Sequence, residues 1–179
     1  DSKDYYLTDS DAIIICNLLR HPNLSSLNLS SNPDIGAYCG DSVVNLINRS
    51  DKLKVLNLSE TDIQNKTVVA IGSALKANRV IEEIIMNPCR QRQDGMEDKA
   101  ALSIYDAIVN KPMLKTLDLE WKKYSADVIC KFLELNTPAL SPKLEFYNIK
   151  PDGALKLGLA LTKNDYVESV YVNGSNYEI

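Results

Sequence analysis

The sequence predicts an α/β solenoid of about six strand–helix units, with parallel strands on the concave side and helices on the convex side. A short apolar pattern that begins at Leu24 returns at Leu53 and again at Leu114. Regular recurrence of this kind is typical of stacked repeat proteins. The segments between the copies change from a strand period to a helical period. At 179 residues with 45% apolar content, the chain can form one ordinary domain.

Each copy of the pattern begins at an apolar anchor that is followed by apolar residues three and five positions later. Alternation over so short a run predicts a strand with one buried face. The six expected strands span 24–29, 53–58, 81–86, 114–119, 144–149 and 167–172. In the fifth strand, this alignment places Leu144, Tyr147 and Ile149 on the buried side.

Between the strands, apolar residues recur at spacings of three and four, which predicts amphipathic helices. The apolar stripes lie within 13–19, 68–75, 101–109, 128–133 and 154–161, and a further helix starts near Asp41 or Ser42. Asn65, Asp98 and Ser125 are suitable N-caps for the later helices, and Pro112 and Pro138 stand where helices should end. Because each helix returns the chain to its starting side, consecutive strands should be parallel.

The repeat is irregular in its loops and at both ends. The loop at 87–96 and the turn at 136–142 are enlarged, whereas Leu144 and Val167 lie closer together than any other two consecutive anchors. The chain starts with the helical half of a unit and stops after a strand. We therefore expect one domain over residues 1–179 that is a fragment, is capped atypically or has an end covered by a partner.

The pattern LxxLxLxx(N/C/T), completed by a helix in each unit, resembles leucine-rich repeats of the ribonuclease-inhibitor type. The resemblance covers most of the chain and is strongest over 53–84. It implies that the ninth position, Asn32 or Cys89 for example, bonds the loop backbone, and Lys122 departs from that rule. The class includes ribonuclease inhibitors, activators of small-GTPase hydrolysis, innate immune sensors and bacterial effectors. The domain size and the long third-unit loop also give a looser likeness to the actin-capping C-terminal domain of tropomodulin.

Composition argues against several functional classes. A net charge of −4 disfavours sequence-independent nucleic-acid binding, and no apolar run approaches a membrane span. The four cysteines contain no CxxC pair and there is a single histidine, His21, so we expect reduced thiols, a cytoplasmic location and no metal or cofactor. His21 is interpreted as a turn residue, and we expect no enzymatic activity.

The non-anchor positions of the strands should line the concave surface. In the first two units these side chains are mostly small, whereas the later units contain acidic and aromatic ones. Exposed aromatic side chains are enriched at interfaces, so we predict a partner-binding face from the following residues: Glu83, Asp118, Glu120, Trp121, Phe146, Asn148 and Tyr171. The alternative for Trp121 is packing on the enlarged loop, and the acids could simply form a solvated face.

Together these features favour a protein–protein interaction module or scaffold whose partner is another protein, with no nucleic acid or membrane involved. Two alternatives belong to other classes. A small-GTPase activator could use Arg90 or Arg92 of the third-unit loop, although loop solvation is the simpler interpretation of these arginines. An actin-capping module would alter actin polymerisation.

Overall fold

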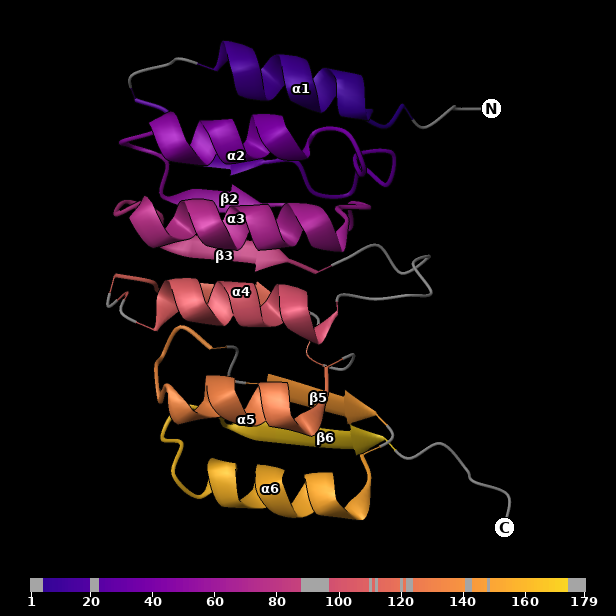
Figure 1. Ribbon diagram of the computed structural model, residues 1–179, viewed down its shortest axis with the longest axis vertical. Coiled ribbons are helices and arrows are strands. Elements are labelled where there is room, and N and C mark those ends of the chain that lie inside the picture. The colour runs from indigo at the N-terminus through magenta and orange to yellow at the C-terminus, as the bar shows by residue number, and fades with distance from the viewer. Residues whose placement is uncertain are drawn as a thin grey trace.

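The computed structural model describes residues 5–19, 23–87, 97–109, 111, 113–119, 121, 124–140, 143–147 and 149–173. Within these residues, helices alternate with strands along the chain. The elements are α1 (Asp9–Leu18), β1 (Ser26–Asn28), α2 (Gly40–Arg49), β2 (Val55–Asn57), α3 (Asn65–Ala77), β3 (Glu83–Met86), α4 (Asp98–Ile108), β4 (Thr116–Leu119), α5 (Ala126–Glu134), β5 (Lys143–Tyr147), α6 (Pro151–Leu161) and β6 (Ser169–Asn173). The helices are stacked in one layer and the strands lie behind them, with α1 and α6 at opposite ends (Figure 1).

The strands pair in parallel, which confirms the predicted α/β solenoid with strands on the concave side and helices on the convex side. In the first sheet, the middle anchors Leu27, Leu56, Ile84 and Leu117 are in register across β1–β4. All four are buried. Each apolar anchor therefore stacks on its counterpart in the next unit, and the core runs as one column between the strand and helix layers.

The predicted helix starts are partly right. Thr8 caps α1 through a reciprocal bond with Asp11, and the Ser125 hydroxyl accepts the Val128 N–H at 3.4 Å, as expected of N-caps. The expected start at Asp41 or Ser42 is wrong, because α2 begins at Gly40 after Cys39. The other two expected caps, Asn65 and Asp98, are instead the first helical residues of α3 and α4.

The first helical residue bonds the following unit rather than its own helix. Asn65 Oδ1 accepts the Glu97 N–H at 3.0 Å, and Asp98 Oδ1 accepts the Ser125 N–H at 3.0 Å. Asp9 does the same for Gly36, Tyr38 and Cys39. These bonds hold the pKa of Asp9 below its usual range, although burial, the largest single effect, opposes them. We call this row of contacts the helix-start ladder.

A second ladder ties the helix ends together. Asn78 Oδ1 accepts the N–H groups of Val80 and Ile81, both at 3.0 Å, while its Nδ2 donates to the Ile47 carbonyl at 2.9 Å. Asn164 repeats this arrangement at the end of the fifth unit, where its Nδ2 donates to the Leu133 carbonyl at 2.9 Å. One amide thus closes its own turn and satisfies a carbonyl at the end of the preceding helix.

The ninth position of the repeat also behaves as the resemblance implies in the first two units. Asn32 Nδ2 donates to the carbonyls of Leu29 and Ser30, at 3.0 and 2.9 Å, and Thr61 Oγ1 donates to the Leu58 carbonyl at 2.6 Å. These bonds fix the turn that leaves each strand. Cys89 and Lys122 lie outside the described residues.

The sheet is interrupted between β4 and β5. The Leu117 N–H donates to the Ala139 carbonyl at 2.7 Å, so the enlarged turn, rather than β5, lies against β4. The strands β5 and β6 form a separate parallel pair. The repeat pattern predicted one uninterrupted sheet, and the enlarged turn is the reason for the difference.

The predicted register of the fifth strand is wrong. Leu144 pairs with Val170 and Phe146 with Val172, so Leu144 takes the middle anchor position rather than the first. Leu144 and Phe146 are both 2% exposed. In this register the step from Leu117 to Leu144 nearly equals the step from Leu144 to Val170, and the apparent shortening of the last unit disappears. The sequence KLEFY is compatible with burial of Leu144 and Phe146 and with burial of Leu144 and Tyr147. The enlarged turn before it shifts the spacing, so the repeat period did not indicate the correct register.

None of the helices that the structure describes combines the length and the apolar character needed to cross a membrane.

Candidate functional site

The strand face, defined as the side of the two sheets turned away from the helices, has two different halves. In β1 and β2 its residues are small or bland: Ser26, Asn28, Val55 and Asn57. From β3 onward the same positions change character. Glu83 neighbours Thr116, Ile85 neighbours Asp118, and Glu145 neighbours Tyr171 across adjacent strands. The inward positions are apolar in all six strands, so this change is confined to the outward side chains.

Charged side chains connect three neighbouring units where their strands begin. Glu82 accepts from Lys54 at 2.8 Å and from Lys115 at 2.5 Å. The hydrogen bond from Lys115 is the main cause that holds the pKa of Glu82 below its usual range, and the bond from Lys54 adds to it. The pKa of Lys115 is raised for the same reason. Both lysines are largely exposed, so this row gives the strand face fixed charges more than it adds stability.

Asp118 is half-buried on the strand face. Its Oδ2 accepts from Asn87 Nδ2 at 2.7 Å. Burial raises the pKa of its carboxyl, and the bond from Asn87 only partly opposes that effect. A carboxylate that has already lost much of its water is a favourable partner for a cation that can approach it.

The structure places the predicted binding residues unevenly. Tyr171 lies on β6 and is 55% exposed. Glu83 and Asp118 lie on neighbouring strands of the first sheet. Four predicted residues lie outside the described part of the chain: Glu120, Asn148, Arg90 and Arg92. A role in partner binding stays a prediction for the residues that do face outward.

Trp121 and Phe146 were expected to be exposed, and this expectation is wrong. Trp121 is 5% exposed and packs edge-on against Tyr124 and Phe132, with ring centroids 6.1 and 5.0 Å apart. Phe146 is buried because the register of β5 turns it toward the helices. Trp121 thus belongs to an aromatic cluster with Tyr124 and Phe132 and serves packing, whereas Phe146 is buried on the helix side of β5.

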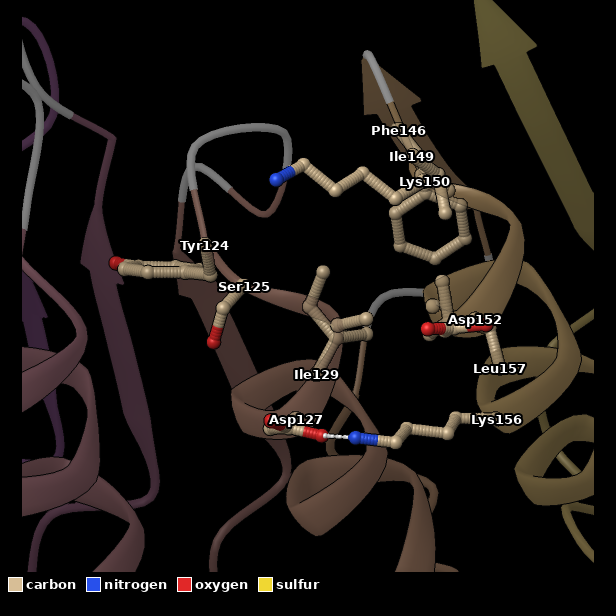
Figure 2. Close-up of a pocket in the computed structure, with 12 residues that line it drawn as sticks. Tyr124, Ser125, Asp127, Ile129, Phe146, Ile149, Lys150, Asp152, Lys156 and Leu157 are labelled. Atoms are coloured by element: carbon tan, nitrogen blue, oxygen red, sulfur yellow. Dashed lines mark hydrogen bonds and ion pairs between the residues drawn. The ribbon is translucent and has the colours of Figure 1, made fainter.

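A cavity of about 340 Å³, which was not predicted from the sequence, opens between the starts of α5 and α6. Apolar side chains of Ile129, Phe146 and Leu157 reach it, while Tyr124 and Ser125 border one side (Figure 2). Lys150 extends across its opening, and the ion pair between Asp127 and Lys156, 2.5 Å long, closes another side (Figure 2). The pocket thus combines an apolar interior with a charged rim.

The pocket arises where the helix-start ladder is broken. The first residue of α5 is Ala126, whose side chain has no oxygen to accept a hydrogen bond from the next unit, and Lys150 is the N-cap of α6 without a side-chain capping bond. A side chain on Gly153 would meet the Ala126 methyl group at 3.0 Å, so small residues are needed at this joint. The signal in the sequence was the alanine at a position that holds aspartate or asparagine in α1, α3 and α4, although α2 also lacks a polar side chain there because it begins with Gly40.

Within the described part of the chain, no three His, Cys, Asp or Glu side chains are placed to hold a metal ion. Cys16 and Cys39 are free and buried, and burial raises the pKa of their thiols to about 11 and about 12. Thiols with such pKa values are poor nucleophiles at neutral pH. His21 and Cys89 lie outside the described residues.

Comparisons with known proteins agree with the leucine-rich-repeat fold. No protein-family model matches the sequence. The human protein named NACHT, LRR and PYD domains-containing protein 13 is 26% identical over 136 residues, and the match spans 73% of this chain but only 12% of that protein. The solved structure of Leiomodin-1 Actin-Binding Site 2 superposes with a TM-score of 0.50 at 14% identity, covering 98% of this chain and 83% of that one. The chain has a leucine-rich-repeat fold.

Proposed function

We propose that this chain is a non-enzymatic protein-binding module whose recognition surface is the later half of the strand face together with the α5–α6 pocket. One observation carries the proposal. The outward positions carry small or uncharged side chains in β1 and β2, whereas β3–β6 add Glu83, Asp118, Glu145 and Tyr171. Side chains that vary on an exposed face while the buried anchors stay constant are what a repeat scaffold needs for recognition.

The pocket supplies the anchor that such a surface needs. Interfaces gain most of their energy from a few side chains inserted into apolar pockets, with polar groups around the rim. Phe146, Ile129 and Leu157 provide the apolar interior, and Lys150 and Asp152 belong to the rim. A partner segment with an apolar side chain next to a charged one would fit both parts of the pocket.

A peptide selection tests this proposal and requires no named partner. Peptides from a displayed random library are selected on the immobilised chain, and the affinity of the best one is measured by fluorescence anisotropy. We expect Tyr171→Ala or Asp118→Asn to weaken binding by about tenfold. Ser26→Ala, on the bland half of the same face, is the matched control and should leave the affinity unchanged. Equal affinities for all four proteins would refute this face.

Actin binding is the second candidate, and the likeness to Leiomodin-1 Actin-Binding Site 2 favours it. The purified chain is added to polymerising actin, and the rates of nucleation and of filament elongation are recorded separately. A change in either rate that increases with the amount of chain added would support actin as the partner. Unchanged kinetics at a large excess of chain would exclude this candidate and leave the general proposal standing.

A further inference from the structure

At three joints of the stack, the start of one helix is hydrogen-bonded to the start of the helix before it. In this helix-start ladder, the side chain of a first helical residue accepts the N–H of the residue that caps the next helix, at 3.0–3.1 Å. The acceptors are Asp9, Asn65 and Asp98, and the N–H groups belong to Cys39, Glu97 and Ser125. The preceding unit thus satisfies a backbone donor that the helix itself leaves without a partner.

The joint between α5 and α6 lacks this bond. Ala126 is the first residue of α5, and Lys150 caps α6. The N–H of Lys150 has the same place at this joint as the N–H of Ser125 at the joint before it, but no described side chain accepts it. The α5–α6 pocket lies at this point, since Ala126 and Lys150 both line it. The pocket is thus found where other joints hold an oxygen.

The joint between α2 and α3 shows how the chain itself can fill the place of a missing acceptor. Its first helical residue is Gly40, and a cavity of about 230 Å³ lies beside it. The Thr67 side chain, 3% exposed, already occupies the space that a side chain on Gly40 would need. Thr67 is the third residue of α3, whereas the third residue of α6 is Gly153. Because Ala126 and Gly153 are both small, the place of the acceptor stays open at the α5–α6 joint.

The charges around the pocket favour an acidic group at this place. The Lys150 side chain extends across the opening, and its ammonium has no ion-pair partner among the described residues (Figure 2). The other lysine, Lys156, bonds Asp127 at 2.5 Å. That bond is the main cause that raises the pKa of Lys156, and Asp152 contributes a little. Asp152 opposes a further acid, but Lys156 partly offsets it, and the N-terminus of α6 adds a partial positive charge.

We propose that the α5–α6 pocket binds a partner segment in which an aspartate stands next to a large apolar residue. The aspartate carboxylate takes the place of the missing acceptor, where one oxygen accepts the Lys150 N–H and the other accepts from the Lys150 ammonium. The apolar side chain enters the pocket between Ile129, Phe146 and Leu157. The occupant is an aspartate side chain rather than a chain end, because the ladder is built from aspartate and asparagine side chains. This inference rests on the proposed function and gives the chemistry of its partner.

The first test places the missing acceptor in the chain itself and needs no partner. In Ala126→Asp, the amide proton of Lys150 should move downfield in the NMR spectrum and exchange more slowly with solvent, as the amide of Ser125 does in the wild type. Ser73→Asp adds the same charge on α3, away from the pocket, and should leave the Lys150 amide unchanged. Ala126→Asn is the second variant if Ala126→Asp does not fold. A Lys150 amide that is the same in the wild type and in the folded variant overturns the proposal.

The second test compares three peptide libraries that share the same random positions. One has a fixed aspartate and blocked ends, the second has asparagine in its place, and the third has asparagine and a free C-terminal carboxylate. The aspartate library should yield the binders, with a large apolar residue beside the aspartate. Changing that aspartate to asparagine in the best peptide should weaken binding by about tenfold, measured by fluorescence anisotropy. Lys150→Met and Ala126→Asp should weaken it by a similar factor, whereas Lys52→Met, the matched control, should leave it unchanged.

The outcomes separate this inference from the proposed function. Binders that keep their affinity without the aspartate, or on Ala126→Asp, overturn the acidic occupant. If the same binders lose affinity on Tyr171→Ala, the proposed function stands without it. Binders from the third library alone would mean that the pocket takes a chain end, which contradicts the aspartate side chain. An aspartate library without binders also overturns this inference, and the selection from a fully random library then decides the proposed function separately.

Discussion

Lys111 stands three residues before the anchor Leu114. The equivalent residue is Asn78 before Ile81 and Asn164 before Val167. The Lys111 ammonium donates to the carbonyls of Leu75 and Asn78, both at 2.6 Å, and the residue is 5% exposed. It thus satisfies carbonyls at the end of α3, where a positive charge is favoured. Burial, with a smaller effect of the Arg79 charge, lowers the pKa of Lys111 to about 8. Lys111 therefore replaces asparagine in the ladder of bonds at the helix ends, although its charge is costly to bury.

The lowered pKa of Lys111 predicts an unusual dependence of stability on pH. Between about pH 8 and its ordinary value of 10.5, the folded chain loses this proton while the unfolded chain retains it. The contribution of Lys111 to the free energy of unfolding must therefore rise with pH over that window, by roughly 3 kcal/mol at most. Urea unfolding of the wild type and of Lys111→Met checks this, because the wild type should gain stability relative to the variant between pH 7.5 and 10.5. A difference that stays constant over this range would contradict the lowered pKa.

At the scale of the element, the same helical position has opposite requirements in α3 and α6. A Cβ on Gly72 would lie 2.6 Å from the Ser103 carbonyl oxygen, whereas a Cβ on Gly158 would meet nothing within 4 Å. Gly72 therefore sets how closely α3 and α4 approach. Gly158 has no such role.

Alanine substitutions at these two glycines form a matched pair. Gly72→Ala should lower the free energy of unfolding by roughly 1–3 kcal/mol, because backbone on α4 must move. Gly158→Ala should leave it unchanged or raise it by up to about 1 kcal/mol, since alanine favours the helix and meets no obstacle. Chemical unfolding of both variants and of the wild type provides the comparison. Equal effects at both sites would contradict the close approach of α3 and α4.

The elements that sequence alone predicted are those whose period is unbroken. The anchors at Leu27, Leu56, Ile84 and Leu117 follow one register, so strand positions and parallel pairing could be predicted for the first four units. The fifth strand could not, because Leu144–Phe146 and Leu144–Tyr147 are both acceptable spacings and only the path of the enlarged turn decides between them. Trp121 was misjudged for a related reason. Its burial depends on contacts with Tyr124 and Phe132, and the repeat pattern does not show which side of the strand end the ring takes.

For the candidate site, the outward strand residues could be predicted from the sequence, whereas the pocket could not. The outward positions of a strand follow from its alternation, so Glu83 and Asp118 could be placed on the strand face. Tyr171 also faces outward, although its neighbours Val170 and Val172 are exposed as well. The α5–α6 pocket was not found, because it depends on what Ala126 lacks. Recognising such a pocket requires the spatial ladder formed by Asp9, Asn65 and Asp98 as a reference.

At the scale of the whole molecule, the interrupted sheet separates two blocks that differ in how many neighbouring strands and helices pack against them. Strands β2 and β3 each have a paired strand on both sides, and their helices α2–α4 pack in succession. The last block consists of α6 and the two-stranded pair β5 and β6. Among the described residues, the enlarged turn before β5 contacts β4 where Leu117 meets residues 139–140. In a solenoid the stability of a unit depends mainly on its own contacts and those with its neighbours. The last block should therefore open more readily than the first.

Native-state hydrogen exchange measures this difference directly. In low concentrations of urea, amides of β6 and α6 should exchange through an opening of lower free energy than amides of β2 and α3, and the two groups should converge only as global unfolding takes over. The physical reason is that opening the last block breaks one sheet junction and one helix junction, whereas exposing β2 requires separation from strands on both sides. Peptide-level mass spectrometry at low micromolar concentration resolves the two blocks. If both groups exchange with the same free energy and the same dependence on urea, the interruption after β4 has no energetic consequence and the chain unfolds as one cooperative unit.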